Sequence, residues 1–405
     1  MSEWRERKLE DLGLLQRGRS RHRPRYDFHL FGGKYPFIQT GEVREARKYI
    51  RKFEQTYSDA GLAQSKLWPK NTLCITIAAN IAELAILSFE ACFPDSVLGF
   101  IPNENTDLDF VYYTLTHFQK ELKHIGEGSV QDNINLGTFQ DVLFPIPGLE
   151  EQKAIALVLS SLDDKIDLLH RQNTTLERMA ETLFRQWFVE EAQSFKLGKI
   201  GDLIEGTFGG DWGKETPEGD FINAANCIRG TDIADLQTGL AKKIPLRFIS
   251  TKKLQNIEPK NGDIIFEISG GTETQSTGRA TYINDDVRSL FAHPLVFSNF
   301  CRLLRPLNST YSFFIYLYLN YLYGQDEFFG LENGSSGIKN LNYKALIFEL
   351  DYPMPSLDRV QEFNLLIAPN FSKINQNKKQ IQALEKLRDN LLPKLMSGEV
   401  RVKLN

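Results

Sequence analysis

The longest regular pattern of apolar positions lies between residues 151 and 190, in a stretch without glycine or proline. Its positions are separated by alternating steps of four and three residues, and Asn173 is the one polar member. The series is Ile155, Leu159, Leu162, Ile166, Leu169, Asn173, Leu176, Ala180, Leu183 and Trp187. A 3.5-residue apolar repeat predicts a long helix with a coiled-coil seam, about 48 Å long.

A second series in the same phase lies 208 positions further along the chain. Pro145-Ile146-Pro147 precedes the first stretch, and Pro353-Met354-Pro355 precedes the second. The shifted series is Phe363, Ile367, Asn370, Ile374, Asn377, Ile381, Leu384, Arg388, Leu391 and Leu395. The shared phase predicts two copies of one unit, each a domain followed by a long helix, with the two helices forming an antiparallel coiled coil.

Five polar or helix-breaking positions qualify this pattern. Asn173, Asn370 and Asn377 are expected to fix the register of the helices, because buried amides are favourable only when they are paired. Arg388 is expected to point to the partner surface or to the helix end. Pro393 is expected to kink or end the last helix.

We therefore expect an α+β fold with two mixed α/β target-binding domains, at residues 1–148 and 194–355, and spacer helices at 149–193 and 356–405. Residues 8–13 match residues 196–201, and Phe37-Ile38, expected to be a buried strand, matches Phe221-Ile222. The framework segments correspond, whereas the polar loops differ between the copies. Such a difference is typical of two binding domains for different ligands.

Composition and charge exclude several classes of protein. The 405 residues contain no run of 18 apolar residues and no apolar N-terminal leader, so no membrane span or secretory signal is expected. Four scattered cysteines without a Cys-x-x-Cys pair favour the cytoplasm. The net charge of −4 does not by itself indicate a nucleic-acid-binding protein, so local patches must carry that function.

The first domain contains arginines at every second position from Arg17 to Arg25. In an extended segment these side chains share one face, so Arg19, Arg21, Arg23 and Arg25 are candidate DNA-phosphate contacts. A solvated arm explains the same pattern equally well. Gln39 and Thr40, at the end of a predicted strand, are candidate base readers, against an ordinary turn. Gln131 is a third candidate, although plain surface loops are the more common role of such glycine-rich segments.

The second domain offers a different set of polar loops. The candidate DNA contacts there are Lys214, Arg229, Thr231, Gln275, Thr277 and Arg279. Trp212 lies among them, and core packing is favoured over stacking on a base.

Motifs for catalysis are absent from the sequence. There is no phosphate-binding loop, no Gly-x-Gly-x-x-Gly and no Asn-Pro-Pro-aromatic string, and no Glu-x-Lys follows Asp263 and Glu267. The six histidines are dispersed without metal-ligand spacing. We expect a binding protein without a catalytic residue, metal or cofactor of its own.

With this order of segments, the chain resembles the specificity subunits of type I restriction–modification systems. The resemblance spans nearly the whole length and is most specific at residues 180–189 and 391–400, which close the two helices. Both Pro-x-Pro entries contribute to it, as do residues 18–25 with 35–43, and residues 209–215 with 269–271.

The resemblance implies a DNA-specificity subunit that reads a bipartite, asymmetric double-stranded target. Two methyltransferase subunits and restriction (motor) subunits would be its partners, and they would carry S-adenosylmethionine, ATP and Mg2+. Trp187 is expected in the seam, and Phe188 beside it as a methyltransferase contact. The main rival is a coiled-coil scaffold that never touches DNA, and a stand-alone methyltransferase or nuclease is a distant third because its motifs are missing.

Overall fold

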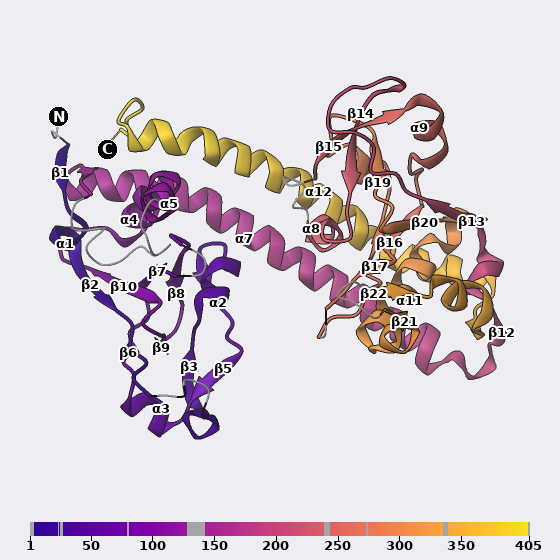
Figure 1. The fold of residues 1–405 in the computed structure, drawn as a ribbon, viewed down its shortest axis with the longest axis horizontal. Helices are drawn as coiled ribbons and strands as arrows, with labels where there is room; N and C mark the ends of the chain where they lie inside the picture. The colour runs from indigo at the N-terminus through magenta and orange to yellow at the C-terminus, as the bar shows by residue number, and fades with distance from the viewer. Residues whose placement is uncertain are drawn as a thin grey trace. The chain divides into compact units, whose positions relative to one another are not determined.

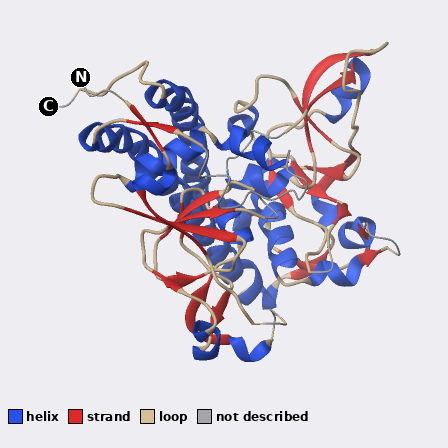
Figure 2. Ribbon diagram, turned by 60° about the vertical axis from the view of Figure 1, so that its left-hand side comes forward, coloured by secondary structure: helices blue, strands red, loops and turns tan. Residues whose placement is uncertain are grey.

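The computed structural model describes residues 4–22, 24, 27–78, 81–127, 142–238, 244–272, 274–334 and 339–403. These residues form two units, one of residues 1–167 with 384–405 and the other of residues 168–383. The long helices α7 (Leu149–Arg185) and α12 (Leu357–Met396) each contribute a part to both units. Figure 1 labels the elements, and Figure 2 shows that helices and strands are mixed throughout.

The first unit is built on two sheets. The larger has the strand order β2 (Gly13–Arg17), β10 (Val97–Pro102), β7 (Leu73–Thr76), β8 (Leu84–Leu87) and β4 (Tyr49–Ile50). The other has the order β5 (Gln55–Tyr57), β3 (Phe31–Phe37), β9 (Ala91–Cys92) and β6 (Leu67–Trp68). The helices are α1 (Leu9–Leu12), α2 (Thr40–Glu45), α3 (Asp59–Ala63), α4 (Leu108–His117) and α5 (Gln119–Glu127). A core of strand and α4 residues continues into α7 and the end of α12, where Ile155, Leu159 and Leu395 are buried.

The second unit repeats the central part of this plan. One sheet has the order β13 (Ile204–Gly209), β20 (Cys301–Pro306), β16 (Ile264–Glu267) and β18 (Ala280–Tyr282). Another is β15 (Leu246–Ser250), β14 (Phe221–Ile228) and β19 (Leu295–Phe297), and a third is β17 (Ser269–Gly270), β22 (Lys339–Leu341) and β21 (Glu332–Asn333). The helices are α8 (Asp232–Thr238), α9 (Thr251–Ile257), α10 (Asp285–Arg288) and α11 (Ser312–Gly324). Among the described residues, no helix combines the length and apolar character needed to cross a membrane.

Each unit closes with a short antiparallel strand pair that contains the first two residues of its Pro-x-Pro segment. In the first unit, β1 (Arg5–Arg7) pairs with β11 (Phe144–Ile146). In the second, β12 (Lys196–Gly198) pairs with β23 (Tyr352–Met354). In each unit, the first described strand and the strand that leads into the next long helix are therefore neighbours.

This closure corrects the alignment of the two copies. β1 and β12 correspond at an offset of 191 residues, so residues 8–12 match residues 199–203, and the predicted match to residues 196–201 was three positions out of register. The backbone N–H of Lys8 donates to Asp11 Oδ2 at 3.0 Å, and the N–H of Lys199 donates to Asp202 Oδ2 at 2.9 Å. This shared bond defines how the two copies align. The repeated Lys-Leu pair, at residues 8–9 and 196–197, had suggested a different alignment.

The predicted match of Phe37-Ile38 to Phe221-Ile222 was also wrong. Phe37 and Ile38 are buried as expected, but Ile222 is 63% exposed. The buried residues of β14 come later in the strand, at Cys227 and Ile228. β14 is longer than β3, so its first residues extend beyond the core.

The residues of the predicted seam are largely buried in the two long helices. Ile155, Leu159, Ile166, Leu169, Asn173, Ile367, Ile374 and Ile381 are each at most 3% exposed. Leu162, Leu176, Leu183, Trp187, Leu384 and Leu391 are half-buried. Within the second unit, Asn377 contacts Asn173, and Asn370 contacts the carbonyl of Leu176. The positions in contact rise along α7 while they fall along α12.

The ends of both long helices depart from the prediction. A π-helical turn at Gln186–Glu190 follows α7 and rotates the face of the helix that points to the core. Phe188 is consequently 2% exposed and packs against Phe184, Phe314 and Phe363, so it does not offer the surface needed for docking a partner. Pro393 does not end α12, which continues to Met396, so of the two predicted effects only a kink stays a prediction.

Candidate nucleic-acid interface

In the first unit, two polar segments meet at the end of β9. Gly18 follows β2 and passes so close to the Phe93–Pro94 backbone that any Cβ would collide with it. The N–H of the next residue, Arg19, donates to the Phe93 carbonyl at 3.0 Å. Ile38, which directly follows β3, donates its N–H to the Cys92 carbonyl at 2.9 Å. The arginine-containing segment and the segment beginning at Gln39 are thus held by two consecutive residues, the last residue of β9 and the one after it.

The second unit contains the same junction with different residues. Gly210 follows β13 and is equally crowded by the carbonyls of Phe297 and Ser298. The N–H of Asp211 donates to the Phe297 carbonyl at 2.8 Å, and the N–H of Ser298 donates to the Ile228 carbonyl at 2.9 Å. Asp211 therefore occupies the position of Arg19 in the first unit. The scaffold is shared, whereas the side chains that it presents have opposite charge.

Gln39 and Arg229 hold equivalent places after the buried strands. The N–H of Gln39 donates to Glu42 Oε2 at 3.0 Å, and the N–H of Arg229 donates to Asp232 Oδ2 at 2.8 Å. In both cases a carboxylate three residues on caps a short helix or turn. Two candidate residues chosen independently from the sequence thus share one structural position.

The arginine segment presents its side chains on alternate positions, as expected for an extended chain. Arg17 and Arg21 are exposed and Arg19 is half-buried, whereas the intervening Gly18 and Ser20 are buried. Among the described residues, none of these three arginines has a carboxylate partner. Arg23 and Arg25 lie outside the described residues, so their predicted role stays a prediction.

Near this segment, Gln39 and Thr40 are half-buried at the start of α2. The Gln39 amide already donates from Nε2 to Gln55 Oε1 at 3.1 Å, so binding a base edge through this group requires exchange of that bond. Gln131 lies outside the described residues.

Three candidates of the second unit lie near its junction. Lys214 is exposed and 3.4 Å from Glu218, and Thr231 is exposed. Arg229 binds the buried carboxylate of Asp232 through two nitrogens at 2.8 and 2.9 Å, and this hydrogen bonding raises the pKa of Arg229. Trp212 is half-buried against the core, with the Arg247 guanidinium 4.4 Å from its ring centre, which agrees with the predicted packing role.

The remaining three candidates are less available than the sequence indicated. Thr277 is fully buried, so it does not lie on the surface that a base reader requires. Arg279 donates two hydrogen bonds, at 2.8 and 3.0 Å, to Glu267, which is itself buried, and it thus has a structural partner. Gln275 is exposed and its Nε2 donates to the Tyr323 hydroxyl at 3.2 Å. Backbone turns at the positive-φ residues Gly271 and Gly278 direct these side chains, and sequence alternation cannot reveal such turns.

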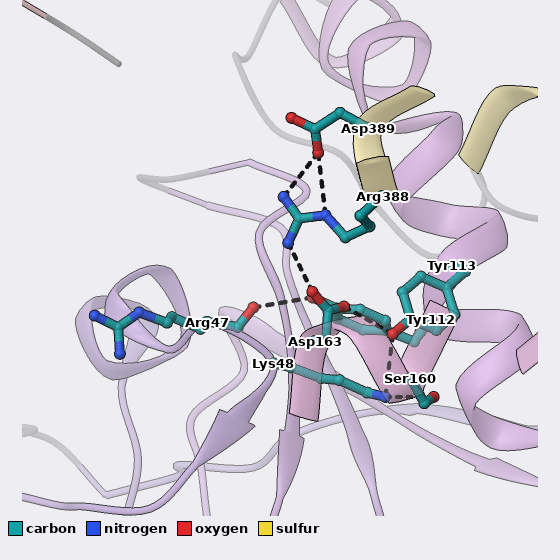
Figure 3. Close-up of polar contacts among 8 residues, drawn as sticks. All are labelled: Arg47, Lys48, Tyr112, Tyr113, Ser160, Asp163, Arg388 and Asp389. Atoms are coloured by element: carbon teal, nitrogen blue, oxygen red, sulfur yellow. Dashed lines mark hydrogen bonds and ion pairs between the residues drawn. The ribbon is translucent and has the colours of Figure 1, made fainter. Parts of the chain in front are cut away.

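Sequence reasoning missed a polar network that joins the first domain to the long helices within the first unit (Figure 3). Lys48 is 4% exposed, lies 3.0 Å from Asp109 and donates to Ser160 Oγ of α7 at 2.8 Å. The Tyr113 hydroxyl donates to Asp163 Oδ2 at 2.7 Å, and burial raises the pKa of Tyr113.

Arg388 of α12 completes this network. Its Nη1 donates to Asp163 Oδ1 at 2.7 Å, so one carboxylate of α7 links the first domain to α12. Burial alone would lower the pKa of Arg388, but Asp163 and Asp389 raise it. Arg388 therefore forms an ion pair between α12 and α7. This agrees with the prediction that it points to the surface of the partner helix.

The comparisons with known proteins agree with this construction. Residues 1–178 match the family described as "Type I restriction modification DNA specificity domain". The type I restriction enzyme MjaIX specificity subunit of Methanocaldococcus jannaschii is 26% identical over 433 aligned residues, which cover 99% of this chain and 94% of the relative. The HindI specificity subunit of Haemophilus influenzae is 26% identical over 213 residues, 47% of this chain and 42% of the relative.

A solved structure shows the same fold. The type I restriction–modification S subunit from M. genitalium aligns over 100% of this chain and 97% of its own, with a TM-score of 0.56 and 17% identity. The resemblance of this chain to the specificity subunits of type I restriction–modification systems is thereby confirmed.

Proposed function

We propose that this chain determines DNA sequence specificity in a type I restriction–modification complex, and that each unit reads one half of an asymmetric, bipartite target. The observation that carries the proposal is the pair of equivalent junctions, where Gly18-Arg19 and Gly210-Asp211 leave matching strands with opposite charge. Base-edge contacts would provide sequence discrimination, and the arginines of the first unit would hold phosphates. Different side chains on a common scaffold favour two unlike half-sites.

The two long helices would act as an antiparallel coiled-coil spacer. The burial of the seam and the opposite order of the contacts in the second unit, at Asn173 with Asn377 and at Leu176 with Asn370, support this pairing. A rigid spacer would fix the gap between half-sites, which lie about 34 Å apart when separated by one helical turn of DNA.

The catalytic work would belong to other chains. Two methyltransferase subunits and restriction subunits would dock on this protein in the cytoplasm and would carry S-adenosylmethionine, ATP and Mg2+. The relatives in the comparisons are named as specificity subunits, which supports a non-catalytic role.

Co-expression with the methyltransferase subunit of the same system, followed by mapping of methylated adenines in the host genome, tests the proposal. We expect a split, asymmetric motif with a constant gap. Gln39→Ala should relax one half of the motif and Arg229→Ala the other half, because the two residues hold equivalent places in the two units. A stable complex without methylation, and without DNA retention at low salt, would favour the scaffold function instead.

A further inference from the structure

One residue of the arginine segment and two residues just beyond it bring together two imidazoles and a carboxylate. Asp27 Oδ1 is 2.6 Å from His29 Nδ1, and Asp27 Oδ2 is 3.4 Å from His22 Nε2. One potential ligand atom from each of the three residues lies within 4.8 Å of the others. His22 and His29 are seven positions apart in the sequence, which showed no metal-ligand spacing, but their ring centroids lie 5.0 Å from each other in the structure.

We propose that His22, Asp27 and His29 bind a divalent transition-metal ion of the zinc class. Two imidazole nitrogens and one carboxylate oxygen form a ligand set that zinc commonly takes, with a fourth position left for water. Neighbouring ligand atoms around tetrahedral zinc are about 3.3 Å apart, close to the His22–Asp27 separation. The shorter His29–Asp27 contact is a hydrogen bond that metal entry replaces, as the metal displaces the bridging proton.

The backbone that carries the three ligands is anchored at both ends of α3. The N–H groups of Arg21 and His22 both donate to Gln64 Oε1, at 2.6 and 3.0 Å. At the other end, the Ser58 hydroxyl donates to the His29 carbonyl at 2.8 Å. Ser58 and Gln64 are the N-cap and C-cap of α3, so one short helix sets the distance between the two histidines. Supporting bonds of this kind hold metal ligands in place before the ion arrives.

The site is open to solvent and adjoins the arginine segment. The side chains of His22, Asp27 and His29 are 33%, 28% and 46% exposed, so an ion and its water can reach them. Arg21 directly precedes His22, and a bound ion would fix the backbone on which Arg21 projects. The consequence for DNA rests on the proposed function, whereas metal binding itself does not.

Metal binding is tested on the full-length chain after removal of metal with a chelator and addition of Zn2+. After desalting, the wild-type chain should retain one equivalent of zinc, and Co2+ should give the visible absorption of a tetrahedral site. His22→Gln/His29→Gln should lose both signals or bind at least tenfold more weakly. The control His117→Gln/His293→Gln, which removes two histidines outside the site, should behave like the wild type.

Asp27→Asn provides the second variant. Asparagine caps the 3-10 turn at Phe28–Leu30 as well as aspartate does but lacks the anionic oxygen, so it should fold and still lose the metal. Equal zinc retention by the wild type and these variants, or no retention by the wild type, overturns the site. If zinc binds but does not tighten DNA binding in the wild type relative to His22→Gln/His29→Gln, the ordering role of the ion is wrong while the site itself stands.

Discussion

Asn377 donates from Nδ2 to Asn173 Oδ1 at 2.8 Å, and both amides are at most 2% exposed in the second unit. The pair is only partly satisfied, because Asn173 Nδ2 and Asn377 Oδ1 are buried without a partner. A buried amide costs stability unless it is fully bonded. The position of this pair within a largely apolar series favours a role in fixing the register of α7 against α12.

We expect Asn173→Leu and Asn377→Leu each to lower the free energy of unfolding by about 1–3 kcal/mol, because each removes the buried bond between the two amides. After Asn173→Leu, Asn377 Nδ2 keeps its 2.9 Å bond to Gln172 Oε1, so this variant should lose less. The double substitution should restore the wild-type value or exceed it. Urea unfolding of the four proteins measures this coupling, with the exposed Gln376→Leu as control. Equal and additive effects of the two single changes would show that the amides do not act as a pair.

The ion pair between Arg388 and Asp163 should stabilise the first unit. Arg388→Met removes the cation and leaves Asp163, a carboxylate whose side chain is 10% exposed, with the Tyr113 hydroxyl as its remaining donor. A loss of about 1–3 kcal/mol is expected by urea unfolding. Lys386→Met, an exposed change on the same helix, should be close to neutral. Equal free energies of unfolding for the two variants would show that the Arg388–Asp163 ion pair does not stabilise the first unit.

The arginine segment predicts a specific salt dependence. Arg17→Gln/Arg21→Gln removes two exposed cations, so binding to any DNA should weaken, and the slope of log affinity against log salt should fall by about 2. Fluorescence anisotropy of the assembled complex with specific and random duplexes measures both effects. Lys70→Gln/Lys120→Gln, matched in charge and exposure, should serve as the control. An unchanged slope would identify the segment as a solvated arm.

Gln275 is exposed and Thr277 is buried, so substitutions at these two candidates should have different effects on DNA recognition. Thr277→Val should leave the methylated motif unchanged and the stability equal or higher, because the buried Thr277 hydroxyl has no partner. Gln275→Ala should relax one base position of the second half-site, by about 1–3 kcal/mol in discrimination if its amide reads a base. Methylation mapping tests both variants, and a motif change in Thr277→Val alone would mean that this region opens on DNA.

Glu177 should make the stability of the second unit depend on pH. Burial raises the pKa of Glu177 from 4.5 to about 7, so the folded chain binds more protons than the unfolded chain between these values. Stability from this group is therefore lost as pH rises from 4.5 to 7, by at most about 3 kcal/mol. Glu177→Gln should flatten this loss in thermal unfolding at pH 5 and pH 7.5, and the exposed Glu362→Gln should not. Parallel profiles for the wild type and Glu177→Gln would contradict the raised pKa.

The long helices were predictable because their period is local and is repeated over many turns. The burial of Ile155, Ile166, Ile374 and Ile381 follows directly from that spacing. The fate of Phe188 was not predictable in this way, because one π-helical turn rotates the face without any glycine or proline to mark it. The sequence therefore predicted where each long helix lies. The conformation at the end of α7 depends on tertiary packing and could not be predicted.

The candidate site was predictable only in outline. Gln39 was predicted at the end of a strand and Arg229 in a polar loop, and the structure shows that they hold equivalent places. Burial of Thr277 and the partners of Arg279 depend on turns and on Glu267 12 residues away. Contacts such as Arg388 with Asp163, 225 residues apart, and the convergence of His22 and His29 require a folded chain.

The antiparallel strand pairs that close the two units have a consequence for how specificity changes. Arg5 pairs with Ile146 in the first unit, and Lys196 pairs with Met354 in the second, so the chain enters and leaves each domain on adjacent strands. A domain that is connected to the rest of the chain through two adjacent strands can be replaced as one segment. Under the proposed function, recombination at these joints would replace one target-reading domain and leave the long helices intact, so a single exchange would change one half of the target.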